Sequence, residues 1–217
     1  MANVKQQLDI PAIPSLGASG VNYSQNVQNQ NNGLLRLFFT KLANVVQSVI
    51  GPMGGKYLNN PYGAFQSLSD QTAAAANTAY AITFDTTNYS NGIVIESSSR
   101  LKVSNAGIYN FQWSGQFQNT DILFQSVNIW LRKNGTDIAG SLGSESVPYL
   151  SGAVNGTSII GRSYFIELNV DDYIELYWST TSTNVSLQFY ATQTSPTRPT
   201  TASVIGTMNF VSNLPTL

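Results

Sequence analysis

Residues 107–118, Gly-Ile-Tyr-Asn-Phe-Gln-Trp-Ser-Gly-Gln-Phe-Gln, decide the fold class. Aromatic side chains recur at alternate positions, and Asn, Gln and Ser fill most of the positions between them. An alternation with a period of two places the two sets on opposite faces of a β-strand. The sequence therefore predicts a long strand that buries Tyr109, Phe111, Trp113 and Phe117 in a core and presents polar groups on its other face.

Further strands are predicted on both sides of this one. Alternation is clear in three of them, 125–133 (Val127, Ile129, Leu131), 173–180 (Ile174, Leu176, Trp178) and 185–191 (Val185, Leu187, Phe189, Ala191), and the others are 78–85, 92–96, 100–104, 157–168 and 203–211. Turns are expected at Asn91-Gly92, Asn134-Gly135 and Asn155-Gly156, and Lys133–Thr136 is the clearest hairpin tip. So many strands without an intervening helix predict a β-sandwich or jelly roll from about residue 63 to 213.

Two of these strands are apolar on both faces. In 157–168, Ile160, Tyr164, Ile166 and Leu168 alternate with Ile159, Phe165 and Glu167, and in 203–211, Val204, Met208 and Phe210 alternate with Ile205 and Val211. A sandwich strand has one core face and one solvent face. A second covered surface is therefore expected, and in a jelly roll of the viral or cytokine kind the cover is a neighbouring subunit.

The first 62 residues have a different pattern. Residues 1–32 predict an extended arm, 33–50 a helix capped by Asn31 or Asn32 and ended by Gly51-Pro52, and 51–62 a connector. A heptad-like seam runs along this helix: Leu35, Phe38, Leu42, Val45 and Val49. The seam fits a helix packed on its own domain, three copies joined around an axis, or a helix lying on a membrane surface.

Composition excludes several classes of function. The 217 residues include no His and no Cys, which removes the usual general base, the thiolate nucleophile and the usual zinc ligands. Charged residues make up only 10% of the chain, and the net charge of −1 gives no basic surface for nucleic acid. The sequence has no run of about 20 apolar residues, so no membrane-spanning helix is predicted. We expect no catalytic residue, no cofactor and no metal.

Four acidic residues gather around one predicted corner. Glu167, Asp171, Asp172 and Glu175 are close in sequence, and Glu167 and Glu175 flank the turn. Three interpretations are open: a solvated corner, a pair of carboxylates for glycoside hydrolysis, and a calcium site formed by Asp171 and Asp172.

Recognition surfaces are sought among aromatic residues and long loops. Five aromatic residues with neutral polar neighbours suit carbohydrate or protein contact if they are exposed, and core or subunit interface otherwise: Tyr80, Tyr89, Tyr149, Tyr190 and Trp130. Residues 139–156 form the longest loop-like stretch, and long loops on rigid scaffolds often carry recognition. The predicted receptor-binding residues in this loop are Glu145, Pro148, Tyr149 and Asn155.

Three motifs resemble signatures of C1q/TNF-like jelly rolls. Gly107–Phe111 is similar to the G-x-Y-x-F strand, Leu131–Gly135 to the L-x-K-N-G hairpin, and Leu168–Leu176 to the L-x-x-G-D-x-(V/I)-x-L corner. Asp171 stands where that corner has Gly, and Asp tolerates the unusual backbone angle better than most residues. The resemblance covers about 65–212 and implies a ten-stranded jelly roll and a tight homotrimer. The side chains expected in its subunit contacts are Tyr164, Phe165, Tyr190, Met208 and Phe210.

The N-terminal part resembles the segment that precedes C1q-like domains in tailed-phage virion proteins, especially those of cyanophages. The resemblance lies in Asn32–Phe39 and Gly54–Phe65. It implies a non-enzymatic trimer on the virion surface, as a capsid decoration, a knob or a tail-fibre component. Residues 1–50 would bind other virion proteins, and the modest excess of basic residues before residue 60 suits an acidic capsid surface. The alternatives are a tail receptor-binding module for host surface glycan or protein, and a glycan hydrolase.

Overall fold

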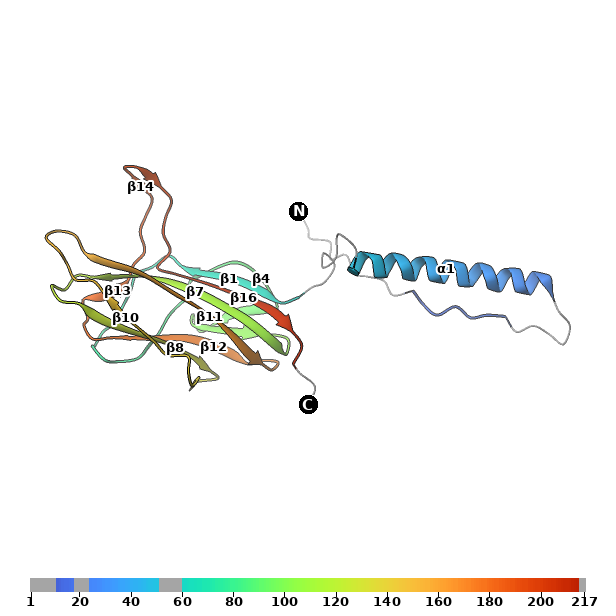
Figure 1. Ribbon diagram of the computed structural model, residues 1–217, viewed down its shortest axis with the longest axis horizontal. Helices are drawn as coiled ribbons and strands as arrows, with labels where there is room; N and C mark the ends of the chain where they lie inside the picture. The colour runs from blue at the N-terminus through green and yellow to red at the C-terminus, as the bar shows by residue number, and fades with distance from the viewer. Residues whose placement is uncertain (1–10, 18–23, 51–59, 215–217) are drawn as a thin grey trace. The chain divides into compact units, whose positions relative to one another are not determined.

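The computed structural model describes residues 11–17, 24–50 and 60–214, with the side chains of residues 48–50 excepted. The chain divides into two compact units, Met1–Asn59 and Asn60–Leu217. Within the described residues the first unit contains one helix, α1 (Gln25–Ile50), and the second is built of antiparallel strands (Figure 1). The predicted all-β class of the main domain is confirmed.

Helix α1 begins eight residues earlier than predicted. Its first turn follows Ser24, whose carbonyl accepts from the Gln28 N–H (3.1 Å) and whose hydroxyl lies 3.5 Å from the Val27 nitrogen. The Asn/Gln-rich run before residue 33 was expected to be extended, and it is helical instead, because a serine cap outweighs the weak helix propensity of asparagine. The predicted stop at Gly51-Pro52 and the connector up to residue 59 lie outside the described residues. No helix in the described ranges is long and apolar enough to cross a membrane.

The strands form two main sheets and a small hairpin. Their bounds are β1 Tyr62–Ser67, β2 Gln71–Thr72, β3 Tyr80–Ala81, β4 Thr86–Asn91, β5 Ile93–Glu96, β6 Arg100–Val103, β7 Gly107–Asn119, β8 Gln125–Lys133, β9 Thr136–Asp137, β10 Gly143–Val147, β11 Gly156–Leu168, β12 Tyr173–Thr180, β13 Val185–Leu187, β14 Gln193–Thr194, β15 Thr197–Arg198 and β16 Val204–Ser212. Sheet A runs β4-β1-β16-β7-β11, with β13 and β2 beside the end of β7. Sheet B runs β5-β6-β12-β8-β10, with β3 and β9 attached.

The two sheets enclose one core between them. Every inward position predicted for β7, β8 and β12 is buried, including Tyr109, Phe117 and Trp178, which are at most 1% exposed. The period-two pattern of these strands is therefore confirmed. Two other predicted strands are shorter than expected: 78–85 yields only β3, and 185–191 yields only β13.

Positive backbone angles occur where turn residues were expected. Asn134 and Gly135 have φ of 50° and 81° and close the hairpin in which Lys133 pairs with Thr136. Asp171 has φ of 67°, so the expectation of an unusual angle at this corner is confirmed. The turn expected at Asn155-Gly156 is wrong: the bend lies at Ser151–Val154, with Gly152 at φ of 62°. Gly156 is a strand residue.

Candidate functional site

The outward face of sheet A is almost free of charge. Paired register places the outward positions of β1, β7, β11 and β16 on this face, and Glu167 is their only charged residue. Ile159 and Phe165 of β11 are 70% and 69% exposed there, and Ile205 of β16 is 47% exposed. Asn, Gln, Ser and Thr fill the space between them. The prediction that β11 and β16 are apolar on both faces is confirmed.

The outward face of sheet B has the opposite character. Arg132 of β8, Glu175 of β12, and Arg100 and Lys102 of β6 carry charges on it. They form ion pairs, such as Arg100–Glu175 at 3.6 Å and Lys102–Glu96 at 3.2 Å. Charged side chains favour contact with water, and interface centres are depleted of them. Of the two faces, that of sheet A is therefore the candidate for a subunit interface.

The residues predicted for subunit contacts divide into exposed and internal ones. Phe165 points outward from sheet A. Tyr164, Tyr190 and Phe210 are half-buried; the Tyr164 hydroxyl donates to the Ser141 carbonyl (2.9 Å), and the Tyr190 oxygen accepts from Gln118 Nε2 (2.7 Å). Met208 is 1% exposed and packs in the core, so its side chain offers no surface to another subunit. The exposed residues Ile159 and Ile205, which were not among the predicted contact residues, lie on the outward face, as Phe165 does.

The seam of α1 is the half-buried side of this helix. Leu35, Phe38, Leu42 and Val45 are all half-buried in the single chain, and the Val49 side chain lies outside the described residues. The side chain of Asn31, on the same side, donates to the Gly17 carbonyl and accepts from the Gly17 N–H, both at 3.0 Å. Other sides of the helix are apolar as well: Leu34, Leu37, Phe39 and Val46 are 41–59% exposed.

The loop predicted at 139–156 contains a strand. Glu145 lies in β10, paired with Val127 of β8, and Gly156 begins β11, so only 139–142 and 148–155 lie outside these strands. The Gly/Ser-rich composition concealed β10, because small residues are acceptable on an edge strand with little to pack against. Pro148 and Tyr149 are exposed, and Asn155 is half-buried.

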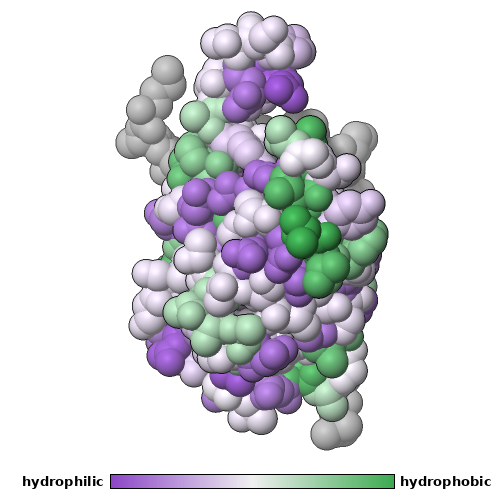
Figure 2. Space-filling model, turned by 90° about the vertical axis from the view of Figure 1, so that its left-hand side faces the viewer, coloured by the Kyte–Doolittle hydropathy of each residue, from purple (hydrophilic) through white to green (hydrophobic). Residues whose placement is uncertain are grey.

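Tyr149 belongs to an exposed apolar cluster at one end of the domain. The Tyr149 and Phe124 rings meet edge to face at 5.0 Å. We call this cluster the apolar tip: Ile122, Leu123, Phe124, Tyr149 and Val154, each 44–74% exposed. The loops that carry it follow the end of β7, whereas the chain enters the domain beside the start of β7. Figure 2 views this loop end directly and shows a band of apolar residues along one side.

Asp121 ties the loops of the apolar tip together. Its Oδ2 accepts from Gln125 Nε2 (3.0 Å) and Ser182 Oγ (3.2 Å), and its carbonyl accepts from the Leu150 N–H (2.7 Å). Burial disfavours the charged carboxylate, but hydrogen bonds from Asn184 and Ser182 outweigh this effect and lower the pKa of Asp121. The apolar side chains of the tip are thus held out on a fixed frame.

A lateral cleft of about 330 Å³ opens between the edge strands β10 and β11. Arg162 and Glu145 line it, together with the buried Trp113. The indole Nε1 of Trp113 is buried without a hydrogen-bond partner in the described part of the chain. Arg162 lies at an inward register position of an edge strand, where an inward charge discourages strand addition.

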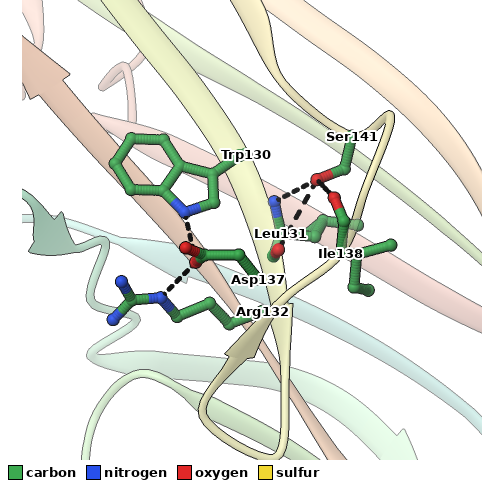
Figure 3. Close-up of polar contacts among 6 residues, drawn as sticks. All are labelled: Trp130, Leu131, Arg132, Asp137, Ile138 and Ser141. Atoms are coloured by element: carbon green, nitrogen blue, oxygen red, sulfur yellow. Dashed lines mark hydrogen bonds and ion pairs between the residues drawn. The ribbon is translucent and has the colours of Figure 1, made fainter.

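A polar cluster lies where β8 turns into β9. Trp130 Nε1 (2.7 Å) and Arg132 Nε both donate to Asp137 Oδ1, as Figure 3 shows. These two donors lower the pKa of Asp137, Arg132 having the larger effect. The Arg132 guanidinium lies 3.8 Å from the centre of the Tyr177 ring. Tyr177 is on β12 and pairs with Trp130 of β8. The predicted hairpin already implied that Arg132 and Asp137 face each other, but not the role of Trp130.

Ser141 fixes the loop that follows β9. Its hydroxyl donates to the Ile138 carbonyl (2.7 Å) and accepts from the Leu131 N–H (3.0 Å), so loop and strand are joined through one buried side chain (Figure 3). The position of Asp137 is therefore determined from both sides, by the β8–β9 hairpin and by the Ser141 contacts.

The acidic corner does not assemble a pair of carboxylates. Glu167 is exposed on the face of sheet A, whereas Glu175 lies in sheet B, 6% exposed, and accepts from Ser99 Oγ (2.7 Å). The interpretation of Glu167 and Glu175 as a carboxylate pair is wrong, because these residues lie in different sheets whose outward faces point apart. Asp171 pairs with Lys102 (3.3 Å) and Asp172 with Lys133 (2.9 Å). Among the described residues, no three acidic side chains gather around one point.

The sequence matches no family model, and a search of curated proteins found no match.

Proposed function

We propose that this chain is a non-enzymatic, trimeric structural protein of a phage virion. Its N-terminal unit anchors it to other virion proteins, and its β-domain is displayed outward as a capsid decoration, a knob or a tail-fibre component. The observation that carries the proposal is the uncharged outward face of sheet A, with Ile159, Phe165 and Ile205 exposed on it. Large apolar side chains exposed on an uncharged face are typical of an interaction surface.

The strand order supports a jelly roll of the C1q/TNF-like kind. Lettered A to H in chain order, the eight principal strands are β1, β6, β7, β8, β10, β11, β12 and β16. They pair as A-H-C-F in one sheet and B-G-D-E in the other. Strands that are neighbours in sequence thus lie in opposite sheets, except D and E, which pair with each other in one sheet. This order is that of two Greek keys. The motif resemblance described above implies the same fold.

The face composition supports assembly into a closed ring. A trimer joins two different surfaces of each copy, and such a contact closes after three subunits when the rotation is 120°. The candidate surfaces are the face of sheet A and the neighbouring open edges of β10 and β11. The charged face of sheet B then remains in water.

Helix α1 supports the anchoring role. Apolar side chains are exposed on more than one side of it, so a single self-contained unit leaves them uncovered. Association of three helices along the Leu35–Val45 seam, or insertion into a partner protein, would bury them. The composition of the chain, low in charge and without His or Cys, agrees with a passive structural protein.

The trimer is tested with paired variants of the full chain. Ile159→Glu combined with Phe165→Glu places two carboxylates on the sheet A face, and Val94→Glu places one on the sheet B face at a residue that is 48% exposed. Analytical ultracentrifugation should give a trimer for the parent and for Val94→Glu, and a smaller species for the double variant. A monomeric parent, or a double variant that remains trimeric with an unchanged far-UV spectrum, contradicts the proposed interface.

The location is tested with an antibody against residues 63–213. Immunogold labelling of intact phage particles should decorate their surface, either over the head or along the tail. Label over the head assigns a decoration role, and label on the tail assigns a fibre role. Particles that carry the gene but bind no antibody before or after disruption contradict the proposal of a virion protein.

A second candidate function is receptor binding at the tail, and the apolar tip favours it. The tip lies at the end of β7 opposite the point where the chain enters the domain, so an anchored N-terminal unit leaves it free to contact a host surface protein or glycan. Ile122→Ser with Phe124→Ser should slow adsorption of phage to host cells while leaving particle yield unchanged. Unchanged adsorption excludes this role for the tip.

A further inference from the structure

A hollow of about 440 Å³ lies beside Trp130 on the outward side of sheet B. This volume is within the ~300–1,000 Å³ range of sites for small ligands. We call it the Trp130 hollow. It is lined by Asn128, Trp130, Asp137, Ile138, Ala139, Gly140, Leu142 and Ser179.

One part of the lining is apolar and flat. Trp130 is the only half-exposed tryptophan of the chain, since Trp113 and Trp178 are buried. Leu142, which is 58% exposed, adds an aliphatic wall. An aromatic ring with one polar edge suits a ligand that has both C–H faces and hydroxyl groups.

The polar groups of the lining have unused hydrogen-bonding capacity. Asp137 uses Oδ1 for Trp130 and Arg132, and its Oδ2 accepts no bond within the described residues. Asn128 Oδ1 accepts from the Ser144 hydroxyl, and the Asn128 amide N–H groups donate no hydrogen bond within the described residues. The Ser179 hydroxyl makes no bond in the described ranges either. The hollow thus offers one acceptor, one donor and one group that can be both.

The same contacts hold these groups in place before any ligand arrives. Two donors fix the Asp137 carboxylate, Ser144 fixes the Asn128 amide, and Ser141 fixes the loop after β9. A preorganised site loses little entropy when it binds.

The charge of the hollow selects against anionic ligands. No cationic side chain is among the lining residues, and the neighbouring Arg132 is already paired with Asp137 and lies over Tyr177. A phosphate, sulfate or carboxylate would therefore meet the Asp137 charge without a free cation to offset it. A neutral polyol with one apolar face is not repelled by the Asp137 charge.

We propose that the Trp130 hollow binds a neutral saccharide. A sugar ring stacks its C–H face on the Trp130 indole, donates a hydroxyl to Asp137 Oδ2, and exchanges hydrogen bonds with Asn128 and Ser179. The hollow lies on the charged face of sheet B, which stays in water in the assembly proposed above. The saccharide site does not depend on trimer formation or on virion location, so its test is separate from theirs.

The test uses the full chain and defined probes. The protein is applied to an array of neutral glycans ending in hexose, N-acetylhexosamine or deoxyhexose, with sialylated and sulfated glycans as acidic comparators. The strongest neutral glycan is then titrated against ¹⁵N-labelled protein. We expect a dissociation constant between roughly 1 μM and 1 mM and a shift of the Trp130 indole N–H signal, with the signals of the buried Trp113 and Trp178 unchanged.

Variants place the binding at this hollow. Trp130→Leu keeps an apolar side chain but removes the ring, and Asp137→Asn removes the charged acceptor; each should weaken binding at least tenfold. Tyr89→Leu, which removes an aromatic residue that is 67% exposed on β4, should leave binding unchanged. Far-UV spectra identify any variant that fails to fold. If the variants do not fold, the shift of the Trp130 indole N–H signal in the parent protein is the test of binding at this hollow. Retention of no neutral glycan, retention of acidic glycans only, or an indole signal of Trp130 that does not move overturns the proposal.

Discussion

Asp172 shows how one side chain stabilises the corner between β11 and β12. Lys133 lies 2.9 Å from its Oδ2, Asn134 Nδ2 donates to its Oδ1 (2.7 Å), and the Asn169 N–H donates to its Oδ2 (2.8 Å). Burial raises the pKa of Asp172, but these partners outweigh burial and lower the pKa to about 2. The folded protein therefore favours the ionised carboxylate more than the unfolded chain does.

This difference predicts a pH-dependent loss of stability in Asp172→Asn. Because the folded pKa lies below the unfolded one, the carboxylate stabilises the fold fully above about pH 4, and its contribution disappears as the pH falls to about 2. We expect Asp172→Asn to lower the free energy of unfolding by about 2 kcal/mol at pH 7. The gap between variant and parent should close by about pH 2 in urea unfolding curves.

Asp171→Asn is the matched control for this experiment. Asp171 is 74% exposed, pairs with Lys102, and has a φ of 67° that asparagine also adopts. Its replacement should change stability by less than about 0.5 kcal/mol. Equal losses in both variants would mean that the lysine contacts, and not the hydrogen bonds that Asp172 accepts from Asn134 and Asn169, stabilise the corner.

Gly156 shows why a residue predicted as a turn is required in a strand. A Cβ atom there would lie 1.9 Å from the Pro148 carbonyl oxygen, which is backbone and cannot rotate away. Gly156→Ala should cost about 3 kcal/mol and lower the melting temperature by roughly 10 °C. At Gly143 the obstacle is the flexible Arg162 side chain, so Gly143→Ala should stay within about 1 kcal/mol of the parent. Calorimetry that finds both variants alike would contradict this account.

At the scale of elements, sequence pattern predicted the strands with large alternating side chains. β7, β8, β12, β11 and β16 appear within a residue or two of their predicted ends, because apolar periodicity records burial directly. β1, β4, β10 and the first eight residues of α1 were missed. Small or polar side chains predominate in these segments. Their conformation depends on pairing with neighbouring strands, such as β10 with β8, or on the cap at Ser24.

The candidate surfaces were predictable to different degrees. Exposed apolar positions on β11 followed from two-faced periodicity alone. The apolar tip and the Trp130 hollow each combine residues from separate loops or strands, such as Phe124 with Tyr149 and Asp137 with Ser179. Such combinations require the sheet register, which a single sequence does not supply.

The pairing of Asn31 with Gly17 predicts how the first unit is held together. Asn31→Ala removes both hydrogen bonds to Gly17, so residues 11–17 should lose their attachment to α1. Hydrogen exchange in this segment should become faster, with α1 itself little changed. Asn32→Ala, an exposed neighbour on the same helix, should leave exchange as in the parent. Unchanged exchange in Asn31→Ala would show that apolar contacts alone hold the segment.

At the scale of the whole molecule, the division at Asn60 predicts separable roles for the two units. The core lies entirely within Asn60–Leu217, so a fragment with these residues should keep the far-UV spectrum of a β-protein and unfold cooperatively. If the sheet A face carries assembly, the fragment should remain trimeric in ultracentrifugation. If α1 is the anchor, as proposed above, the fragment should no longer attach to virus particles.

Each departure from this result has a definite meaning. A folded but monomeric fragment, beside a trimeric full chain, would move the trimer contacts from the sheet A face to the seam of α1. A fragment that still decorates particles would remove the anchoring role from the N-terminal unit and give it to the β-domain, where the apolar tip becomes the first surface to mutate. The same fragment should bind neutral saccharide as the full chain does, because every residue that lines the Trp130 hollow lies within it.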